Sequence, residues 1–562
     1  MTTALDTQRR ARFARLVLAV SMLVMGACGI IYEYTLGVLG NNLMGSSHEQ
    51  LFVIIGLMLF AMGLGAMLQQ QLVASLVDRF LWIELLLGLL GGTSTIVIYT
   101  SFVFTDSYQL IMYAFALSIG VLIGCEIPLL IRINTQYTDS LRGNLSTILS
   151  MDYVGSLAGA LLFTYVLLTR VSVERISLLL GCVNTLLAIG GLVYFWSEVG
   201  RRRLLAVSCS AVLAGLAFAL SQSASWMSQL EQRCFEDPVI YSETSRYQHL
   251  VLTQSHTKDR TRLYIDGNLQ FSSEDECIYH EMLVHVPMSL ATSREHVLIL
   301  GGGDGLALRE VLKYPDVKKV TLVDIDLAVI RMAATVPDLI EINQAAFHDA
   351  RVHVVPSNGV QDAAETTTIQ CRTHRHPLVD QTRYDLAEVT VFTVDADLFV
   401  RDVDKAHDVI LVDFPDPRSV ELAKLYSVGF YRSLSKRLKS GGMCSIQSTN
   451  PFRGREVFRC IGRTLQTAGL HSLPYHDHVP SFGEWSWHLA WTGDSTPEEM
   501  QTRIRQVQDL AISTSYLTPE AMSAAFVFGL SDELDEPVRP STRLQPIVMQ
   551  YYAESLARNR SY

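Results

Sequence analysis

The chain has 562 residues and a formal net charge of -11, and 49% of its residues are hydrophobic while only 18% are charged. This length allows two or three domains, and the composition is too apolar for a disordered or an ordinary soluble chain, so part of the chain is expected in a membrane. The negative charge disfavours nucleic acid as a partner and suits a small cationic ligand.

The apolar residues gather in the first part of the chain. A membrane-spanning helix needs about 20 apolar residues, and seven runs reach that length. They lie near residues 15–40, 50–70, 81–104, 109–133, 145–169, 176–197 and 203–221. We therefore predict an N-terminal α-helical membrane bundle of about seven helices over residues 1–222, surrounded by membrane lipid.

Arginines mark one side of this predicted bundle. They cluster before the first run, after the fourth and between the last two, which favours these ends as cytoplasmic, although Arg170 and Arg175 lie on the other side. Seven full crossings would place the rest of the chain outside the cytoplasm, whereas an interfacial seventh run, containing Ser208 and Ser210, would return it. We predict a multi-pass protein of the cell (inner) membrane with a cytoplasmic catalytic part, and the side stays open at this stage.

Acidic residues interrupt the apolar runs. Glu33, Glu126 and Asp152 lie inside predicted spans, where a charged side chain costs about 2.5–3.5 kcal/mol. Two interpretations carry equal weight: the acids pair with neighbouring side chains and fix helix packing, or they line a site for a cation. Glu84 and Glu174 lie near span ends and are expected at the membrane interface.

A linker and a small β domain are predicted over residues 223–285. The segments RYQHLVLTQ and TRLYIDGNLQF alternate in the manner of strands, and Asp266-Gly267-Asn268 is typical of a hairpin turn. The amphipathic stretch DECIYHEMLVHVPMSL follows and leads into the next domain.

Residues 286–562 begin with the pattern of a nucleoside-binding α/β domain. The strand HVLIL runs into GGGDG at 301–305, a helix follows, and the next strand ends at Asp324. Glycines let the backbone approach a ligand, and an acid at the end of the second strand can accept hydrogen bonds from both ribose hydroxyls. Because Asp304 in the turn would repel a phosphate, the pattern predicts a nucleoside with a cationic extension, such as a sulfonium. We expect a doubly wound, Rossmann-like sheet of the methyltransferase type.

Two more acids follow a third buried strand. The segment HDVILVDFPDP places Asp413 and Asp416 after this strand, and the carboxyl ends of the strands in a doubly wound sheet line the same crevice. Four carboxylates in one crevice are unfavourable unless cations fill it. Nine cysteines without a CxxC pair predict neither a zinc ribbon nor a disulfide framework.

Ordered motifs from about Tyr241 to Tyr552 carry a resemblance. They include SRYQHLVL, DGNLQFSSEDECIYHEMLVHVP, GGGDG, VDID, DVILVDFPDP, IQSTNPF and VPSFGEW, and LVMGACGIIYEYTLGVLG matches near the start. The sequence resembles the spermidine synthase family of polyamine aminopropyltransferases, in particular its membrane-anchored bacterial members. The resemblance implies transfer of an aminopropyl group from decarboxylated S-adenosylmethionine, as co-substrate, to putrescine or a related amine, with release of methylthioadenosine. It further implies no cofactor, no metal and a homo-oligomer, in the simplest case a dimer.

The resemblance also implies roles for particular residues. Asp413 would take the proton from the attacking amine, Asp304 would bind the aminopropyl ammonium and Asp324 the ribose. The other substrate-binding residues that it implies are Asp416, Tyr279 and His280 for the acceptor amine, Gln248 and Gln270 around the donor, Asp395 and Ala396 at the adenine, and Gln447 and Phe482 in the later motifs.

Three departures from the family and two alternatives accompany this prediction. Asp324 replaces the more usual glutamate, Phe482 replaces a family tyrosine, and an insert near 356–389 carries His374 and His376, for which a surface loop is favoured over a metal site. An S-adenosylmethionine-dependent methyltransferase is one alternative, disfavoured because the acids would repel the donor carboxylate. A non-catalytic membrane protein that binds polyamines or nucleosides for transport or sensing is the other.

Overall fold

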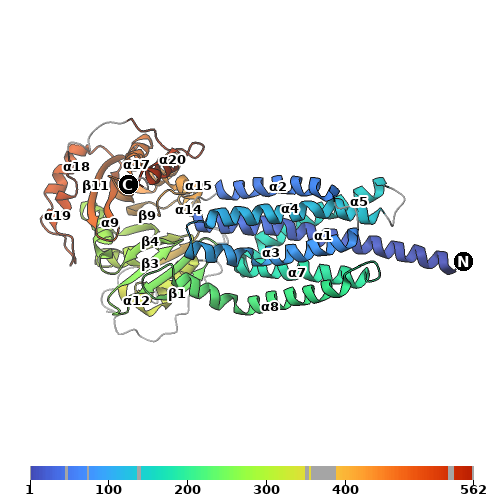
Figure 1. Cartoon of the computed structure of the whole chain (residues 1–562). Helices are drawn as coiled ribbons and strands as arrows, with labels where there is room; N and C mark the ends of the chain where they lie inside the picture. The colour runs from blue at the N-terminus through green and yellow to red at the C-terminus, as the bar shows by residue number, and fades with distance from the viewer. Residues whose placement is uncertain are drawn as a thin grey trace. The chain divides into compact units, whose positions relative to one another are not determined.

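The computed structural model describes residues 2–44, 49–71, 75–135, 141–348, 353–355, 388–529 and 537–559. The chain divides into two compact units, Met1–Glu236 and Asp237–Tyr562 (Figure 1). The predicted insert, with His374 and His376, lies almost entirely outside the described residues, except that its last two residues begin a strand.

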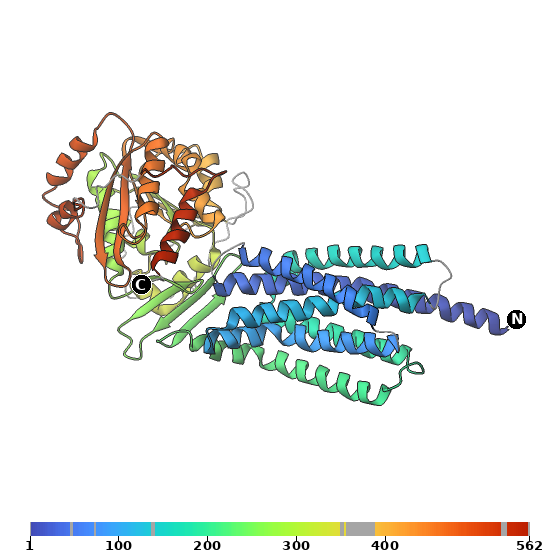
Figure 2. The same cartoon turned by 45° about the horizontal axis from the view of Figure 1, so that its top comes forward.

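The first unit is helical, and its long helices run side by side (Figure 2). Within the described residues, seven helices are long and apolar enough to cross a membrane, and each coincides with a predicted run. The elements are α1 (Thr2–Met44), α2 (Glu49–Leu68), η1 (Gln69–Gln71), α3 (Leu76–Phe104), α4 (Tyr108–Asn134), α5 (Leu141–Leu162), η2 (Phe163–Leu167), α6 (Leu168–Arg170), α7 (Val173–Tyr194) and α8 (Arg202–Gln232). Since α8 has 31 residues and meets the same criteria as the others, its length gives no support to an interfacial seventh run.

Glycines allow the helices of this unit to approach closely. A Cβ on Gly155 of α5 would lie 2.0 Å from the main-chain oxygen of Leu23 on α1, and one on Gly124 of α4 would lie 2.1 Å from that of Met62 on α2. Such close contacts of small residues are how helices pack where no hydrophobic effect drives them together.

One expectation about the helical unit is wrong. Glu84, predicted at the interface because the apolar run was placed from residue 81, lies on α3, which begins at Leu76, and its exposed fraction is 0%. The helix begins before the predicted run because its first residues include Asp78 and Arg79, which the apolar pattern left out. Glu84 therefore lies about one turn further from the end of the helix than the run suggested.

The second unit opens with a small antiparallel sheet. Its strands are β1 (Val239–Thr244), β2 (His249–Gln254), β3 (Thr261–Ile265) and β4 (Asn268–Ser272), in the order β1-β2-β3-β4. Asp266 and Gly267 join β3 to β4 with φ values of 49° and 75°, the left-handed conformation that a two-residue hairpin turn needs. The predicted hairpin is confirmed.

An eight-stranded mixed sheet forms the centre of this unit. Its strands are β5 (His296–Gly301), β6 (Lys319–Asp324), β7 (His353–Val355), β8 (Glu388–Thr393), β9 (His407–Asp413), β10 (Leu438–Gln447), β11 (His471–Val479) and β12 (Gly483–Trp491), in the order β11-β12-β10-β9-β5-β6-β8-β7. The six strands β5 to β10 pair in parallel with their neighbours among themselves. β12 is antiparallel to both of its neighbours, β10 and β11. The chain adds strands on one side of β5 and then continues with β9 on its other side, so the topology switches between these two strands.

Helices cover both faces of the large sheet. Val297 and Ile299 of β5 belong to one buried core and Leu298 and Leu300 to a second, which shows that alternate side chains meet two different layers. The helices of the unit are α9 (Glu276–Leu290), α10 (Leu306–Val311), α11 (Leu327–Thr335), α12 (Pro337–Ile342), α14 (Ala396–Asp402), α15 (Val420–Ala423), η3 (Lys424–Tyr426), α16 (Val428–Ser435), α17 (Arg455–Thr467), α18 (Pro497–Arg505), α19 (Pro519–Ala524) and α20 (Ile547–Asn559). The predicted doubly wound arrangement is therefore present.

Candidate active site

The predicted acids lie at one edge of the eight-stranded sheet. Asp413 ends β9 and is in register with Gly301, the last residue of β5, and Asp324 ends β6. The three strands are parallel neighbours, so these residues and the GGGDG turn share the edge where doubly wound sheets bind ligands. Gly301 is required here, because its φ is +84° and a Cβ would lie 2.0 Å from the main-chain oxygen of Asp413.

Asp413 receives a hydrogen bond from the helix before the sheet. The hydroxyl of Tyr279 on α9 donates to Oδ1 of Asp413 at 2.6 Å. Burial raises the pKa of Asp413 to about 6; His280 opposes this rise, Asp304 adds to it and the Tyr279 hydrogen bond opposes it. The carboxylate is thus ionised at neutral pH and basic enough to accept a proton during a reaction.

The next residue on α9, His280, carries a positive charge into the same region. Its Nδ1 lies 2.9 Å from Oε2 of Glu276 and 2.8 Å from the Glu276 main-chain oxygen. Burial by itself would lower the pKa of His280, but the hydrogen bond and charge of Glu276, together with Asp304 and Asp413, raise it to about 9. Protonated His280 therefore offsets part of the negative charge of the site.

Main-chain amides hold the carboxylates of Asp304 and Asp324. Leu306 donates to Oδ1 of Asp304 at 3.0 Å, and Gly303 and Asp326 donate to Oδ2 and Oδ1 of Asp324 at 3.0 and 2.8 Å. Burial raises the pKa of both acids, that of Asp324 to about 6. A carboxylate has about four acceptor positions, so Asp324 can still accept hydrogen bonds from the two hydroxyls of a ribose.

Asp416 belongs to a second polar cluster beyond the end of β9. Gln447 ends β10 and donates from Nε2 to Oδ1 of Asp416 at 2.9 Å, while its Oε1 accepts from the Tyr426 hydroxyl at 2.9 Å. Burial raises the pKa of Asp416, although its hydrogen bonds with Gln447, Thr449 and Tyr552 oppose the rise. The structure therefore brings the predicted residues Asp416 and Gln447 together and adds Tyr426, from the segment KLYS at residues 424–427.

Asp395 and Ala396 follow β8, two strands away from β5. Asp395 caps α14 by accepting from the Asp397 amide at 2.8 Å, and it forms an ion pair with Lys424. Ala396 is the first residue of α14 and is buried. Since β8 is parallel to β6, in register from Asp324 backward, both residues lie at the same edge as the other acids.

Phe482 lies in the turn between β11 and β12 and contacts the helix that carries the predicted acceptor residues. Its ring centroid is 6.4 Å from that of Tyr279 and 5.1 Å from that of Trp485. The ring therefore presents an apolar surface beside Tyr279.

Gln248 and Gln270 belong to the small sheet. The main-chain amide of Gln248 donates to Oγ of Ser245 at 3.1 Å. The Ser245 hydroxyl in turn donates to Oδ2 of Asp326 at 2.5 Å, which links Gln248 to the loop after β6. The side chain of Gln270 donates to the main-chain oxygen of Asn268 at 3.2 Å and so is engaged within its own hairpin.

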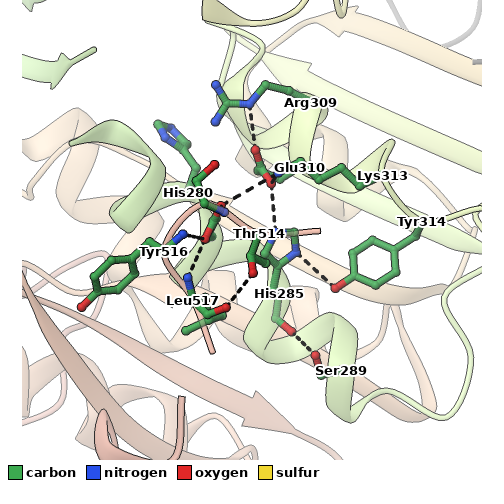
Figure 3. Close-up of polar contacts among 12 residues, drawn as sticks. His280, His285, Ser289, Arg309, Glu310, Lys313, Tyr314, Thr514, Tyr516 and Leu517 are labelled. Carbon is green, nitrogen blue, oxygen red and sulfur yellow. Dashed lines mark hydrogen bonds and ion pairs between the residues drawn. The ribbon is translucent and has the colours of Figure 1, made fainter. Parts of the chain in front are cut away.

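His280, through Glu276, is one end of a buried ionic network that the motifs did not predict. Figure 3 shows its Arg309–Glu310–His285 part. Arg309 donates to both oxygens of Glu276 at 2.7 and 2.9 Å and to Glu310 at 2.8 Å. Glu310 in turn lies 2.9 Å from Nε2 of His285. A signal existed in the sequence, because DECIYHE and LALREVLK place ionisable residues at helical spacing on buried helices, a pattern that requires internal partners.

The same network contains a group with the composition of a metal site. Ligand atoms of Glu281, His285 and Glu310 lie within 4.8 Å of one another. However, Lys313 pairs with both glutamates, and the main-chain amides of residues 515–517 donate to Glu281 at 2.6–2.9 Å (Figure 3). These donors already satisfy the carboxylates, so the group is a structural ion network.

Fold and site together define an enzyme class. A glycine turn and Asp324 suit a nucleoside, buried acids suit a cation, and Asp413 suits the removal of a proton between them. The site belongs to a nucleoside-dependent enzyme that acts on a cationic substrate.

Comparison with known proteins agrees with this class. The Spermine/spermidine synthase domain matches residues 276–370 and 370–502. The chain is 34% identical to a polyamine aminopropyltransferase of Oceanobacillus iheyensis over 95% of this chain and 96% of that protein, and 36% identical to polyamine aminopropyltransferase 2 of Ralstonia nicotianae over 96% and 98%. A crystal structure of spermidine synthase with the transition-state analogue AdoDATO is 26% identical and covers 52% of this chain and 85% of that chain, with a TM-score of 0.41.

The chain therefore belongs to the polyamine aminopropyltransferase family. It is a transferase that moves an aminopropyl group from decarboxylated S-adenosylmethionine, a co-substrate, to an amine. The predicted family, reaction and enzyme class are confirmed, and neither the methyltransferase nor the non-catalytic alternative is favoured.

Proposed function

We propose that this enzyme aminopropylates putrescine or a related diamine and that Asp413 is its catalytic base. The observation that carries this proposal is the partly buried Tyr279–Asp413 hydrogen bond of 2.6 Å at the carboxyl end of β9, beside Asp304 and the protonated His280. This arrangement combines a partly buried carboxylate of raised pKa with a hydroxyl that orients it and with charged neighbours of both signs.

The reaction needs an amine that has lost its proton. The acceptor binds as an ammonium and gives one proton to Asp413, whose pKa of about 6 keeps the carboxylate ionised until then. The free amine nitrogen then attacks the aminopropyl carbon attached to sulfur, the carbon–sulfur bond breaks, methylthioadenosine leaves, and the product is a secondary ammonium. Tyr279 fixes the orientation of the carboxylate, so little reorganisation is needed.

The donor is proposed to lie along β5, β6 and β8. Asp324 accepts from the ribose hydroxyls, Asp304 pairs with the aminopropyl ammonium, and Asp395 with Ala396 contacts the adenine. Support comes from their common position at the edge of parallel strands and from the short turn at Gly303, whose amide already binds Asp324. Gln248 and Gln270 flank the donor from the small sheet.

The acceptor is proposed to lie between α9 and the strands that follow β9. Asp416, oriented by Gln447, binds the ammonium group of the diamine that does not react. Tyr279 and His280 line the reactive end, and Phe482 contacts the methylene chain between the two nitrogens. Phe482 stands where the family has a tyrosine, so this position offers an apolar ring without a hydroxyl. Such a surface favours diamines whose middle segment is purely hydrocarbon.

Mass spectrometry of the products tests this function. The detergent-purified full chain is incubated with decarboxylated S-adenosylmethionine and each of a series of diamines from three to five carbons. Methylthioadenosine and a product heavier by one aminopropyl group are expected with putrescine or a neighbouring homologue. Methylthioadenosine without an aminopropylated amine, or product only from S-adenosylmethionine itself, would refute the proposal.

The helical unit is proposed to span the cell membrane, surrounded by lipid, with the synthase unit in the cytoplasm. The seven long apolar helices support the first part. The donor supports the second, because a charged nucleoside does not cross a bilayer unaided. Seven crossings then put the amino-terminal end of α1 on the outer side, against the arginine bias.

Reporter fusions decide this orientation. A fluorescent protein that matures only in the cytoplasm, fused after Tyr562, is expected to fluoresce, and alkaline phosphatase at the same position is expected to be inactive. The reverse result would establish the orientation that the arginines favour. We also propose a homodimer, which light scattering of the detergent complex checks; a monomeric mass would exclude it.

A further inference from the structure

A cation of the chain itself lies beside the proposed acceptor site. Arg418 follows Asp416 by two residues in the segment after β9, and its main-chain amide donates to the Asp416 main-chain oxygen at 2.7 Å. This tight turn keeps the two residues close together. The Arg418 side chain is only 20% exposed, so it lies against the protein instead of extending into water.

The Arg418 guanidinium is held by an acid of the small sheet. Its Nη2 donates to Oδ2 of Asp266 at 3.1 Å, in the turn between β3 and β4. Asp266 is itself fixed to β2, because its Oδ1 accepts from the His249 main-chain amide at 2.8 Å and its own amide donates to the His249 main-chain oxygen at 2.9 Å. The ion pair therefore joins a fixed carboxylate to the segment that carries Asp413 and Asp416.

The small sheet reaches across the candidate site through this pair. It contacts the loop after β6 through Ser245 and Asp326, and the segment after β9 through Asp266 and Arg418. In the large sheet β5 lies between β6 and β9, and the turn that follows β5 carries Asp304. The Arg418–Asp266 pair is therefore on the β9 side of the site, where the acceptor is proposed to bind.

The charge of Arg418 reaches the acid that is proposed to bind the acceptor. Burial raises the pKa of Asp416, and the positive charge of Arg418 opposes this rise. Three acids thus follow one another on this side of the site: Asp413, Asp416 and, through Arg418, Asp266. A guanidinium does not lose its proton in proteins, so the third acid is already paired with a permanent positive charge.

We propose that Arg418 is a specificity-determining residue that restricts the acceptor to a diamine, because its guanidinium takes the place at Asp266 that a third ammonium group would need. This inference rests on the proposed function, in which the reacting amine lies at Asp413 and the other ammonium at Asp416. Spermidine carries one more positive charge than putrescine and would have to displace Arg418 or lie unpaired beside it. A penalty against the wrong substrate is a common source of specificity.

Competition between two acceptors tests this role. The detergent-purified full chain receives decarboxylated S-adenosylmethionine with equal amounts of isotopically distinct putrescine and spermidine, and mass spectrometry measures the initial rates of both products. In Arg418→Gln the Asp266 carboxylate is released for a third ammonium. The kcat/KM for spermidine relative to putrescine is expected to rise about fivefold, the upper range for one contact with a partly exposed charge.

Two variants serve as controls for Arg418→Gln. Arg418→Lys keeps the positive charge opposite Asp266 and is expected to keep the parent ratio. Lys318→Gln breaks an exposed ion pair with Glu295 at the opposite edge of the sheet, before β6 and β5 begin, and is also expected to keep it.

Substitution of the acid separates substrate selection from packing. Asp266→Asn leaves Arg418 without its carboxylate, so the positive charge is expected to disfavour spermidine further and the ratio falls below that of the parent. In the Arg418→Gln background the same change is expected to cancel the fivefold gain, because the third acid is gone. A pair that only fixes the hairpin would instead give both single variants the same effect on the ratio.

The outcomes of this experiment distinguish the two proposals. No aminopropylated product from either amine with the parent would refute the proposed function itself. Product from putrescine, together with an unchanged ratio in Arg418→Gln or a ratio that moves in the same direction in Arg418→Gln and Asp266→Asn, would overturn only the role of Arg418. If Arg418→Gln does not fold, Asp266→Asn decides alone, and a ratio that does not fall in this variant overturns the proposal.

Discussion

Both units of this protein shield acids from water, partly in the synthase unit and fully in the helical unit, and they differ in what contacts these acids. In the synthase unit Asp413 receives the Tyr279 hydroxyl, Asp324 receives two main-chain amides and Asp416 receives Gln447. In the helical unit the carboxyl groups of Glu84 and Glu126 are buried and interact with each other. Acids that accept hydrogen bonds from fixed donors are held in one geometry, whereas two facing acids in an apolar interior repel each other unless a proton or a cation lies between them.

Replacement of Asp413, the proposed catalytic base, is expected to have the largest effect on activity. Asp413→Asn keeps the shape and the Tyr279 contact but cannot accept a proton, so kcat is expected to fall by at least about 100-fold. Steady-state assays of the full chain measure kcat, and calorimetry measures donor binding, which is expected to persist.

The control for this variant is Asp404→Asn, an exposed acid of the same unit that pairs with Arg437. Its turnover is expected to match the parent. If Asp413→Asn retains more than about a tenth of the parent kcat, another group takes the proton, and Asp413 is not the base.

The pH dependence of the reaction should show the next largest effect. The pKa of Asp413 is raised to about 6, so the base form predominates above pH 6 and the inactive acid form below it. The parent kcat/KM is therefore expected to be level between about pH 7 and 8 and to fall about tenfold per pH unit below 6. A rate profile from about pH 4.5 to 8 measures this, and a level profile down to about pH 5 would contradict it.

The sequence predicts the parts of this molecule that have a local signature. Strand length, turn glycines and the acids after strands indicate the sheet. Because parallel strands bring their carboxyl ends to one edge, these patterns alone group Asp304, Asp324 and Asp413 in one crevice. The hairpin at Asp266 and Gly267 and the seven apolar runs have equally local causes.

What the sequence did not reveal depends on contacts between distant elements. Arg309 meets Glu276 only because α10 packs on α9, and no spacing within either helix shows it. Glu84 was misplaced because the polar start of α3 concealed one turn of the span, and its partner Glu126 comes from the next helix. Pairings of this kind arise from tertiary packing and have no pattern of their own in the sequence.

The ionic network behind His280 gives a smaller, more specific prediction. In Glu276→Gln only one side-chain oxygen is left to accept the hydrogen bonds of Arg309 and His280. The negative charge that holds the pKa of His280 near 9 is lost as well, so this pKa is expected to drop. Neutral His280 no longer lowers the pKa of Asp413, and the acid limb of kcat/KM therefore moves to higher pH.

The rate profile of Glu276→Gln, measured beside the parent, tests this role. At about pH 6.5 the expected loss in kcat/KM is about fivefold, and at about pH 8 it is smaller. A loss that is the same at every pH would indicate that Glu276 acts only in packing. Because Arg309 also loses a charged partner, unfolding in denaturant is expected to show a stability loss of about 3 kcal/mol.

The smallest expected effect concerns the choice of acceptor. Phe482→Tyr adds a hydroxyl on a ring whose centroid lies 6.4 Å from that of Tyr279. One hydrogen bond to a substrate nitrogen is worth about 1 kcal/mol, or about fivefold in kcat/KM. Acceptors with a nitrogen in the middle of the chain should gain by this factor relative to putrescine, whose central segment is hydrocarbon.

Competition between putrescine and spermidine as acceptors, with both products measured in one mixture, gives the ratio of the two kcat/KM values directly. Phe482→Leu serves as the control, since it removes the ring without adding a donor and is expected to slow both acceptors alike. An unchanged ratio in Phe482→Tyr would show that Phe482 does not face the acceptor, and that the acids of this unit, rather than its aromatic side chains, select the amine.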